Sequence, residues 1–234
     1  MLTPALETVI KARGYLRSAH RGAPSFGIDN TDLAIRAALE YAPDLIEVDA
    51  HRTADNELIL WHDNFVNDAG ERLTIVQTAL ERLQAVRLKD GSRLLTLDEA
   101  LQISAGKAGL LIDLKAPKLE NLILESLRRC NAQNAVVCGG YTDTLRAVQA
   151  AGIPASYTPD PLRELFKPKP LEWDALTVHH RTVTPAMLAR ANAEGVRVIA
   201  WTVDDPQRMR ELIALGIHGI TTNRIEILKS LEAI

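Results

Sequence analysis

The chain has 234 residues, of which 47% are hydrophobic and 24% charged, and its formal net charge at pH 7 is −3. This composition is typical of a folded protein with a sizeable core, and the slightly acidic charge makes nucleic acid a poor candidate partner. No stretch approaches the ~18 consecutive apolar residues of a membrane-spanning helix, so the sequence predicts no transmembrane segment.

Residues 1–14 predict a helix ahead of the first strand. Thr3 is placed to cap it, Pro4 falls at its first position, and three apolar residues share one side: Leu6, Val9 and Ile10. The segment lacks the basic region and apolar core of a secretory signal. The chain also has only two cysteines, which form no CxxC motif and indicate free thiols. We therefore expect a cytoplasmic protein with unpaired Cys130 and Cys138.

Strand-like and helix-like segments then alternate to the end of the chain. The strand candidates are short, apolar or β-branched, and bounded by Gly, Asp or Pro; they lie at residues 15–20, 45–51, 109–115, 134–139, 153–158, 175–180, 196–203 and 218–223. Helical patterns lie at residues 31–42, 119–130, 142–151, 184–195, 205–216 and 224–234. This alternation predicts an α/β fold with parallel strands, closed as a (β/α)₈ TIM barrel, whose typical size is ~250 residues.

A doubly wound open sheet is the structural alternative. The glycine-rich nucleotide-binding turn expected after its first strand is absent, because residues 20–27 read HRGAPSFG. Residues 63–96 interrupt the alternation and are too long for a simple connection. We interpret them as a short insertion after the second strand that covers one end of the barrel, within a single catalytic domain spanning residues 1–234.

Polar side chains gather where the predicted strands end. The first strand ends at His20 and Arg21, and the seventh ends at Trp201. The second strand carries two acidic residues and the third carries an acidic and a basic residue, each pair in alternate positions that share one face: Glu47 with Asp49, and Asp113 with Lys115. His62 and Asp63 follow soon after the second strand. Because the carboxyl ends of barrel strands form the functional face, we expect these groups to converge.

The three acidic residues would repel one another in a barrel interior. Buried carboxylates need a compensating charge, and a divalent cation can supply it to Glu47, Asp49 and Asp113. Ligands that are all oxygen favour Mg²⁺ or Ca²⁺ over a softer metal. The sequence therefore predicts a divalent metal site.

The basic residues indicate an anionic substrate. The guanidinium of Arg21 suits a phosphate group, and Lys115 adds a second cation. His20 and His62 have the chemistry of a general acid and a general base on opposite sides of phosphorus. Gly22 is expected to let the loop pass close to the substrate. Together these residues predict metal-assisted cleavage of a phosphodiester.

Five stretches resemble the glycerophosphodiester phosphodiesterase family and span nearly the whole chain in the family's order. They are AHRG at 19–22, the run from DNTDL to LILWHD at 29–63, RLLTLDEAL at 93–101, LLIDLKAP at 110–117, and the run from VRVIAWTVDDP to GITTNR at 196–224. The resemblance implies a TIM barrel that uses a divalent metal to hydrolyse glycerophosphodiesters to glycerol 3-phosphate and an alcohol. A neighbouring hydroxyl would attack phosphorus, and a cyclic phosphate would then be hydrolysed.

By position, the resemblance implies roles for the residues already singled out. His20 and His62 match the two catalytic histidines, and Glu47 and Asp49 match metal ligands, with Asp113 in the place of a third. The remaining three residues are expected to bind substrate and its phosphate: Arg21, Lys115 and Trp201.

The sequence departs from the family pattern at several points. Asp113 stands where glutamate is usual, and Asp29 begins a segment that normally reads E-N-T, although a role in capping the next helix survives. The usual T-D-R-P reads Thr222-Asn223-Arg224-Ile225, and residues 138–141 read CGGY in place of a serine-rich end. Two histidines at the sixth strand have no family role and are interpreted as a strand end, with a contact to substrate as the alternative: His179 and His180.

Two alternative functions remain open. A phospholipase D-like enzyme acting on lysophospholipids or sphingolipids would need an exposed apolar surface, for which the insertion offers Phe65, Val66, Leu73 and Ile75. A barrel that binds a phosphorylated metabolite without turnover is the other. The leaving alcohol, the preferred metal and the oligomeric state have no signature in the sequence.

Overall fold

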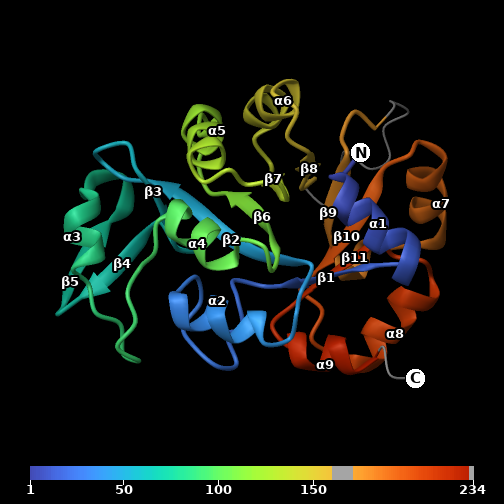
Figure 1. Cartoon of the computed structure of the whole chain (residues 1–234), viewed down its shortest axis with the longest axis horizontal. Coiled ribbons are helices and arrows are strands. Elements are labelled where there is room, and N and C mark those ends of the chain that lie inside the picture. The colour runs from blue at the N-terminus through green and yellow to red at the C-terminus, as the bar shows by residue number, and fades with distance from the viewer. Residues whose placement is uncertain (160–170, 232–234) are drawn as a thin grey trace.

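Eight parallel strands close into a barrel in the computed structural model, which describes residues 1–159 and 171–231. In chain order they are β1 (Leu16–Ala19), β2 (Leu45–Arg52), β6 (Gly109–Leu114), β7 (Ala135–Gly139), β8 (Ala155–Tyr157), β9 (Ala175–His179), β10 (Arg197–Trp201) and β11 (Gly219–Thr222). Each strand pairs in parallel with the next, and β1 pairs with both β2 and β11. These two pairings close the cylinder, so the predicted TIM barrel is confirmed and the open sheet is excluded (Figure 1).

Helices connect most of the strands along the outside of the barrel. They are α2 (Asp32–Leu39), α4 (Leu97–Ser104), α5 (Glu120–Arg129), α6 (Thr142–Ala150), α7 (Pro185–Ala193), α8 (Pro206–Ala214) and α9 (Ile225–Ser230). All but α4 fall within the predicted helical segments, although residues 232–234 of the last segment lie outside the described residues. The start of α4 carries a reciprocal cap between Thr96 and Glu99, a T-x-x-E signal that is visible in the sequence.

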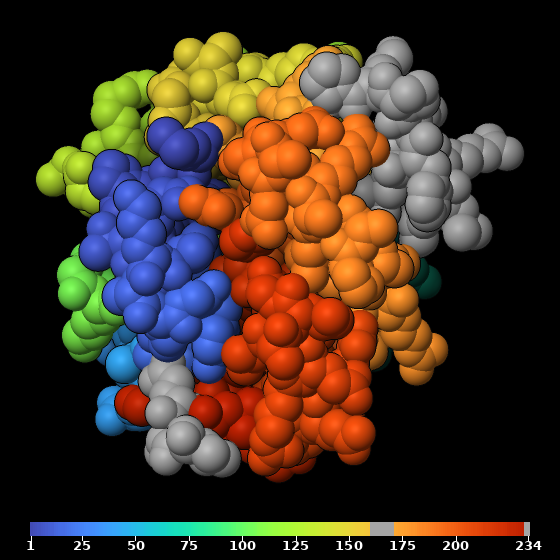
Figure 2. Space-filling model, turned by 90° about the vertical axis from the view of Figure 1, so that its right-hand side faces the viewer, coloured from blue at the N-terminus to red at the C-terminus, as the bar shows by residue number. Residues whose placement is uncertain are grey.

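An additional helix, α1 (Pro4–Arg13), covers the end of the barrel where the strands begin. Thr3 caps it and Pro4 occupies its first turn, as predicted. Its apolar side packs into a buried cluster with residues from the starts of several strands: Leu2, Leu6 and Ile10 against Leu16, Leu45, Val136 and Ala175. Figure 2 shows this part of the chain, in blue, lying beside the orange and red segments and below the yellow one. With this end filled, the opposite end of the barrel remains for a site.

The insertion after β2 forms a separate small lobe. It contains β3 (Leu58–Leu60), the hairpin of β4 (Phe65–Asp68) and β5 (Glu71–Thr74), a 3₁₀ turn η1 (Ile75–Gln77) and α3 (Leu80–Gln84). β3 runs antiparallel to the end of β2, so the excursion begins slightly earlier than predicted. Its apolar side chains close on one another in a cluster of their own. Figure 1 shows the lobe extending from the side of the barrel, and Asp63 and Asp90 of the insertion border a hollow beside Arg21.

The described helices include none that is both long and apolar enough to cross a membrane. Cys138 is buried inside the barrel, Cys130 is half-buried, and both are free thiols. This agrees with the prediction that the two cysteines are unpaired.

Candidate active site

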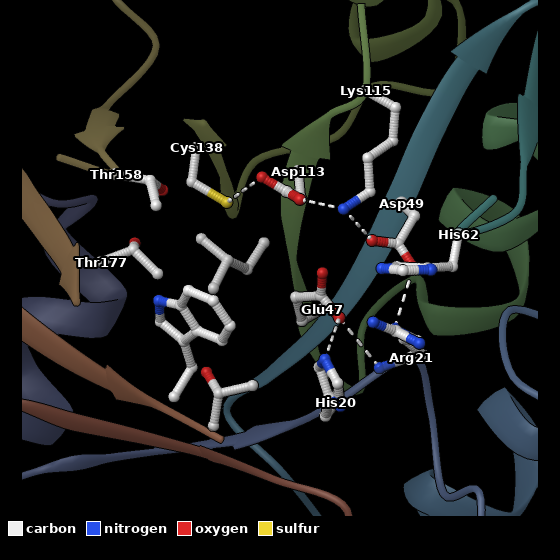
Figure 3. A pocket seen from close by; sticks show the side chains of 13 residues that line it. His20, Arg21, Glu47, Asp49, His62, Asp113, Lys115, Cys138, Thr158 and Thr177 are labelled. Carbon is white, nitrogen blue, oxygen red and sulfur yellow. Dashed lines mark hydrogen bonds and ion pairs between the residues drawn. The ribbon is translucent and has the colours of Figure 1, made fainter. Parts of the chain in front are cut away.

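All eight predicted site residues line one pocket at the carboxyl ends of the strands (Figure 3). The pocket has a volume of about 130 Å³. The eight come from the ends of β1, β2, β6 and β10 and from the segment after β3: His20, Arg21, Glu47, Asp49, His62, Asp113, Lys115 and Trp201. The structure therefore brings the set together, while the role of each residue remains a prediction.

Three carboxylates form the floor of this pocket. Glu47 and Asp49 point to the same side of β2 because alternate residues of a strand share a face. The register of the parallel pair places Asp113 of β6 directly opposite Asp49. One oxygen from each of the three carboxylates lies within 4.8 Å of the others. This arrangement is compact enough to surround a single cation.

Two cations contact this cluster unevenly. The Nζ of Lys115 lies 2.7 Å from Oδ1 of Asp49 and 2.5 Å from Oδ2 of Asp113. The Nε of Arg21 lies 3.0 Å from Oδ2 of Asp49. Glu47 instead accepts the backbone N–H of Arg21 at 3.0 Å. Asp49 is therefore well compensated, whereas Glu47 is not.

The pKa values of the carboxyl groups follow from these surroundings. Burial raises the pKa of Glu47 well above its usual range, and repulsion from Asp49 and Asp113 adds to the rise. Burial also raises the pKa of Asp113, although Lys115 opposes it. At Asp49 the effect of burial is outweighed by Lys115 and Arg21, so its pKa is lowered. The cluster is short of positive charge, and its oxygen-only donors fit a hard divalent cation such as Mg²⁺ or Ca²⁺.

The two histidines differ in exposure and in partners. His20 is largely enclosed, its Nδ1 lies 2.7 Å from Oδ1 of Asn223, and its Nε2 lies 3.9 Å from Oε2 of Glu47. Burial lowers the pKa of His20. The side chain of His62 is 47% exposed, and its Nδ1 lies 2.8 Å from Oδ1 of Asp63. His62 also borders a second, more open hollow that shares Arg21 with the main pocket.

The turn after β1 holds an unusual backbone conformation. Arg21 has φ +54° and Gly22 has φ +91°. A Cβ on Gly22 would lie 2.6 Å from the backbone carbon of Ala34 in α2, which no real side chain tolerates. The sequence did not predict this need for glycine in packing against a helix, and the expected approach of the loop to the substrate stays a prediction.

Sequence reasoning missed the partner that fixes Asp49. Asn30 is fully buried with φ +61°; its Nδ2 donates to Oδ2 of Asp49 at 2.8 Å, and its Oδ1 accepts the Asp49 N–H at 3.0 Å. Asn30 belongs to the segment interpreted only as a helix cap, a role that Thr31 performs for α2. An asparagine between Asp29 and Thr31 is a signal for a left-handed turn, but it does not indicate which strand the side chain reaches.

Five further pocket residues were not predicted as part of the site: Leu111, Cys138, Thr158, Thr177 and Thr221. The Sγ of Cys138 lies 3.7 Å from Oδ1 of Asp113, within the range for a thiol hydrogen bond. Burial raises the pKa of this thiol well above its usual value, with Asp113 and Glu47 adding to the rise. Cys138 therefore stays a neutral donor beside the carboxylates.

The histidine pair at the sixth barrel strand stands beside this pocket. His179 ends β9 and His180 begins a 3₁₀ turn, with ring centroids 4.7 Å apart. His179 also meets Trp201 edge-on at 5.8 Å. Among the described residues, neither histidine lines the pocket. The interpretation of the pair as a strand end agrees with this placement.

Comparison with known proteins gives one consistent family. A model described as the glycerophosphoryl diester phosphodiesterase family matches residues 20–163 and 153–227. A glycerophosphodiester phosphodiesterase from Caldanaerobacter subterraneus is 26% identical over 91% of this chain and 96% of its own length.

Solved structures give the same picture of the fold. A glycerophosphodiester phosphodiesterase from Parabacteroides distasonis superposes with a TM-score of 0.83 and 24% identity, covering 93% of this chain and 96% of its own. A phosphodiesterase from Oleispira antarctica, solved in complex with the product sn-glycerol-3-phosphate, has a TM-score of 0.82 and 20% identity, covering 94% and 97% of the two chains.

Proposed function

The chain belongs to the glycerophosphoryl diester phosphodiesterase family and is a phosphoric diester hydrolase, and from this premise we propose that it hydrolyses glycerophosphodiesters to glycerol 3-phosphate and an alcohol. The observation that carries the proposal is the single pocket in which three carboxylates, two cations and two histidines meet. The product bound to the structural relative from Oleispira antarctica is sn-glycerol-3-phosphate, which supports the same product here.

We propose that Glu47, Asp49 and Asp113 hold a divalent metal ion. Their oxygens are close enough to share one cation, and burial beside two other carboxylates raises the pKa of Glu47 despite the nearby Lys115 and Arg21. A bound divalent ion would supply the missing positive charge and polarise a phosphate oxygen.

Arg21 and Lys115 would complete the phosphate site. Both side chains line the pocket next to the carboxylates. In this structure the Lys115 ammonium contacts Asp49 and Asp113, so substrate phosphate would compete with these carboxylates for its N–H groups. Trp201 forms part of the opposite wall, and its indole N–H has no hydrogen-bond partner among the described residues. This free donor supports its predicted contact with substrate.

The histidines would transfer the protons in two steps. In the first, one histidine takes the proton of the glycerol 2-hydroxyl as its oxygen bonds to phosphorus, and the other protonates the departing alcohol. In the second, water opens the cyclic phosphate and the two histidines exchange roles, which gives glycerol 3-phosphate. His20 and His62 both border the pocket, as this exchange requires.

A direct assay tests the function. Purified protein is incubated with glycerophosphocholine, glycerophosphoethanolamine and glycerophosphoglycerol, each with Mg²⁺, Ca²⁺ or Mn²⁺, and glycerol 3-phosphate is measured. We expect turnover that EDTA abolishes and added metal restores. Folded protein that releases no glycerol 3-phosphate from any diester with any metal would refute the proposal.

The four residues that the sequence offered for contact with lipid do not form an exposed apolar surface. The apolar residues offered for contact with lipid are not exposed, because Val66, Leu73 and Ile75 are buried in the core of the insertion. Phe65 is half-buried, and the guanidinium carbon of Arg72 lies 3.6 Å from its ring centroid. Binding to vesicles of lysophosphatidylcholine, measured by flotation, would favour this alternative.

A barrel that binds without turnover would also give a distinct result. It would bind a divalent metal and glycerol 3-phosphate, both measurable by calorimetry, yet release no alcohol from any diester. Nothing in the described pocket favours it, since both histidines border the same cavity as the carboxylates.

A further inference from the structure

We propose that Asp204 and Asn223 are positioning residues that hold His20 with its proton on Nδ1, so that Nε2 is the base of the first step. The assignment rests on the proposed function, because it decides which histidine begins as the base. The three residues come from separate strands: His20 follows β1, Asp204 lies beyond β10 and Asn223 directly follows β11.

Asp204 acts only as an acceptor in these contacts. Its Oδ1 accepts the Asn223 backbone N–H at 2.8 Å and the Thr222 hydroxyl at 3.0 Å. The Thr222 oxygen in turn accepts the backbone N–H of Arg224 at 2.9 Å, which leaves its hydroxyl hydrogen for Asp204. The remaining oxygen, Oδ2, faces the side-chain amide of Asn223 at 2.8 Å. An ionised carboxylate has no proton to donate, so it selects the NH₂ side of that amide.

The orientation of Asn223 then fixes His20. With its NH₂ group directed to Asp204, Asn223 presents Oδ1 to Nδ1 of His20 at 2.7 Å. A carbonyl oxygen can only accept, so Nδ1 must carry the proton. A neutral imidazole with its proton on Nδ1 has a lone pair on Nε2. The order of donors and acceptors thus runs from Asp204 through Asn223 to the outward nitrogen of His20.

The free nitrogen faces the pocket. Nε2 of His20 lies 3.9 Å from Oε2 of Glu47, and Figure 3 shows the ring directed toward that carboxylate. A lone pair at this place can take the proton of the attacking 2-hydroxyl. His62 is then the group that protonates the departing alcohol as the phosphorus–oxygen bond breaks. In the second step His62 takes a proton from water, and His20 returns its proton to the 2-oxygen.

A variant that reverses the orientation of the Asn223 side-chain amide tests the proposal. In Asp204→Asn the new amide NH₂ faces residue 223, so Asn223 should turn its carbonyl toward it and its own NH₂ toward His20. His20 would then carry its proton on Nε2 and lose the lone pair. We expect kcat to fall by roughly 10²–10⁴-fold with KM little changed. Asp205→Asn is the matched control, because the Asp205 carboxylate is engaged in capping α8, where it accepts the backbone N–H groups of Gln207 and Arg208.

A double variant that exchanges the side chains at positions 204 and 223 should restore the order of hydrogen-bond donors and acceptors. In Asp204→Asn with Asn223→Asp, the amide at 204 donates to the carboxylate at 223, and that carboxylate accepts from Nδ1 of His20. The amide oxygen at 204 still accepts from Thr222 and from the backbone N–H of residue 223. We expect the double variant to recover most of the activity that Asp204→Asn loses. Failure to recover in a folded double variant would contradict the proposal.

The tautomer itself is measured without any assay of activity. Long-range ¹H–¹⁵N spectra of the histidine rings at alkaline pH report which nitrogen is protonated, and a His20→Gln spectrum assigns the His20 signals. We expect Nδ1–H in the natural protein and Nε2–H in Asp204→Asn. Nε2–H in the natural protein, or no change in Asp204→Asn, would overturn the assignment. Since the spectra need no substrate, this outcome is distinct from failure of the proposed function.

A second variant tests the proposal if Asp204→Asn folds poorly. Asn223→Ala removes the acceptor opposite Nδ1, so both tautomers should appear in the spectrum and kcat should fall. If Asn223→Ala kept the single Nδ1–H signal and the natural rate, Asn223 would not position His20.

Discussion

Glu47 and Asp49 face the same pocket from one strand, yet their pKa values shift in opposite directions. Asp49 accepts hydrogen bonds or ion pairs from Asn30, Lys115 and Arg21, which favour its charged form. At Glu47, burial and two neighbouring carboxylates disfavour the charged form. This asymmetry makes Glu47 the carboxylate that gains most from a bound cation.

Replacing Glu47 should therefore have opposite effects on stability and metal affinity. We expect Glu47→Gln to raise the unfolding free energy of the metal-free protein by on the order of 1 kcal/mol, because a buried like-charge contact is removed. It should weaken Mg²⁺ binding at least ~10-fold. Thermal unfolding in EDTA and calorimetric titration with Mg²⁺ measure the two effects. The exposed Glu57→Gln is the control, and equal behaviour of the two variants would contradict the metal role.

The two histidines should be needed for turnover but not for folding. We expect His20→Ala and His62→Ala each to lower kcat by roughly 10²–10⁴-fold, because each removes one proton transfer. Circular dichroism should show an unchanged fold. His179→Ala serves as the control, because His179 stands outside the pocket lining. A natural rate in either pocket variant would disprove its acid or base role.

His218 predicts how stability depends on pH. It is buried at the closed end of the barrel, and its Nδ1 accepts the Val198 N–H at 3.0 Å. Burial, with Arg197 adding, lowers its pKa to about 4. The unfolded chain therefore binds the proton first as pH falls, so this residue's contribution is present above about pH 6.5 and is lost toward pH 4.

A variant isolates that contribution. His218→Asn keeps an acceptor but does not titrate, so its unfolding free energy should fall less steeply between pH 6.5 and 4. The difference in slope should approach ~1 kcal/mol per pH unit. Urea unfolding at several pH values measures both slopes. Parallel slopes would show that the pKa of His218 is the same in the folded and the unfolded protein, which would contradict the prediction.

At the scale of elements, the β1–α2 turn is set by packing rather than by the pocket. Gly22 has both a left-handed φ and a Cβ position that collides with α2. We expect Gly22→Ala to lower the unfolding free energy by about 2–4 kcal/mol. Gly70→Ala is the matched control, because Gly70 has φ +89° but nothing within 4 Å of its Cβ position, and it should cost only ~1 kcal/mol.

Urea unfolding measures the loss of unfolding free energy in each variant. Equal losses would mean that the positive φ alone sets the cost, and that α2 moves aside to accommodate the new Cβ. Because Gly22 adjoins Arg21, a loss of activity in Gly22→Ala is also expected. That loss follows from displacement of the turn, so it does not show that Gly22 contacts substrate.

Elements with a strong local signal could be predicted from the sequence. The barrel strands are short apolar runs between turn residues, and α8 begins at Asp205 followed by Pro206. The helix α4 was missed despite the Thr96–Glu99 signal, because it lies at the end of the insertion that was interpreted as one excursion. A local pattern also does not fix how the insertion packs against the barrel.

The candidate site also contains residues that could be predicted from the sequence and residues that could not. Glu47, Asp49 and Asp113 could be placed on one face because the period of a strand and the end of a barrel are local rules. Asn223 could not, since its role depends on His20, 203 positions away in the chain. Neither Asn30 nor Asp204 carries a sequence pattern that names its partner. Such contacts arise only when the whole barrel has closed.

At the scale of the whole molecule, the two ends of the barrel differ in composition and in their expected roles. The closed end is apolar and is filled by α1, whose Glu7 forms an ion pair with Arg197 of β10 at 2.6 Å. The open end gathers charge from the ends of several strands. Substitutions that change activity without unfolding should therefore concentrate at the open end, while those at the closed end should act through stability.

The position of α1 has a consequence for synthesis on the ribosome. α1 and β1 leave the exit tunnel before the other segments of the barrel, yet their partners include Arg197 and β11, which are made after most of the barrel. Until then the apolar side of the helix and one edge of β1 lack their final neighbours. The nascent chain thus carries an incomplete barrel until β11 has emerged, a state that invites chaperone binding and delays closure of the barrel.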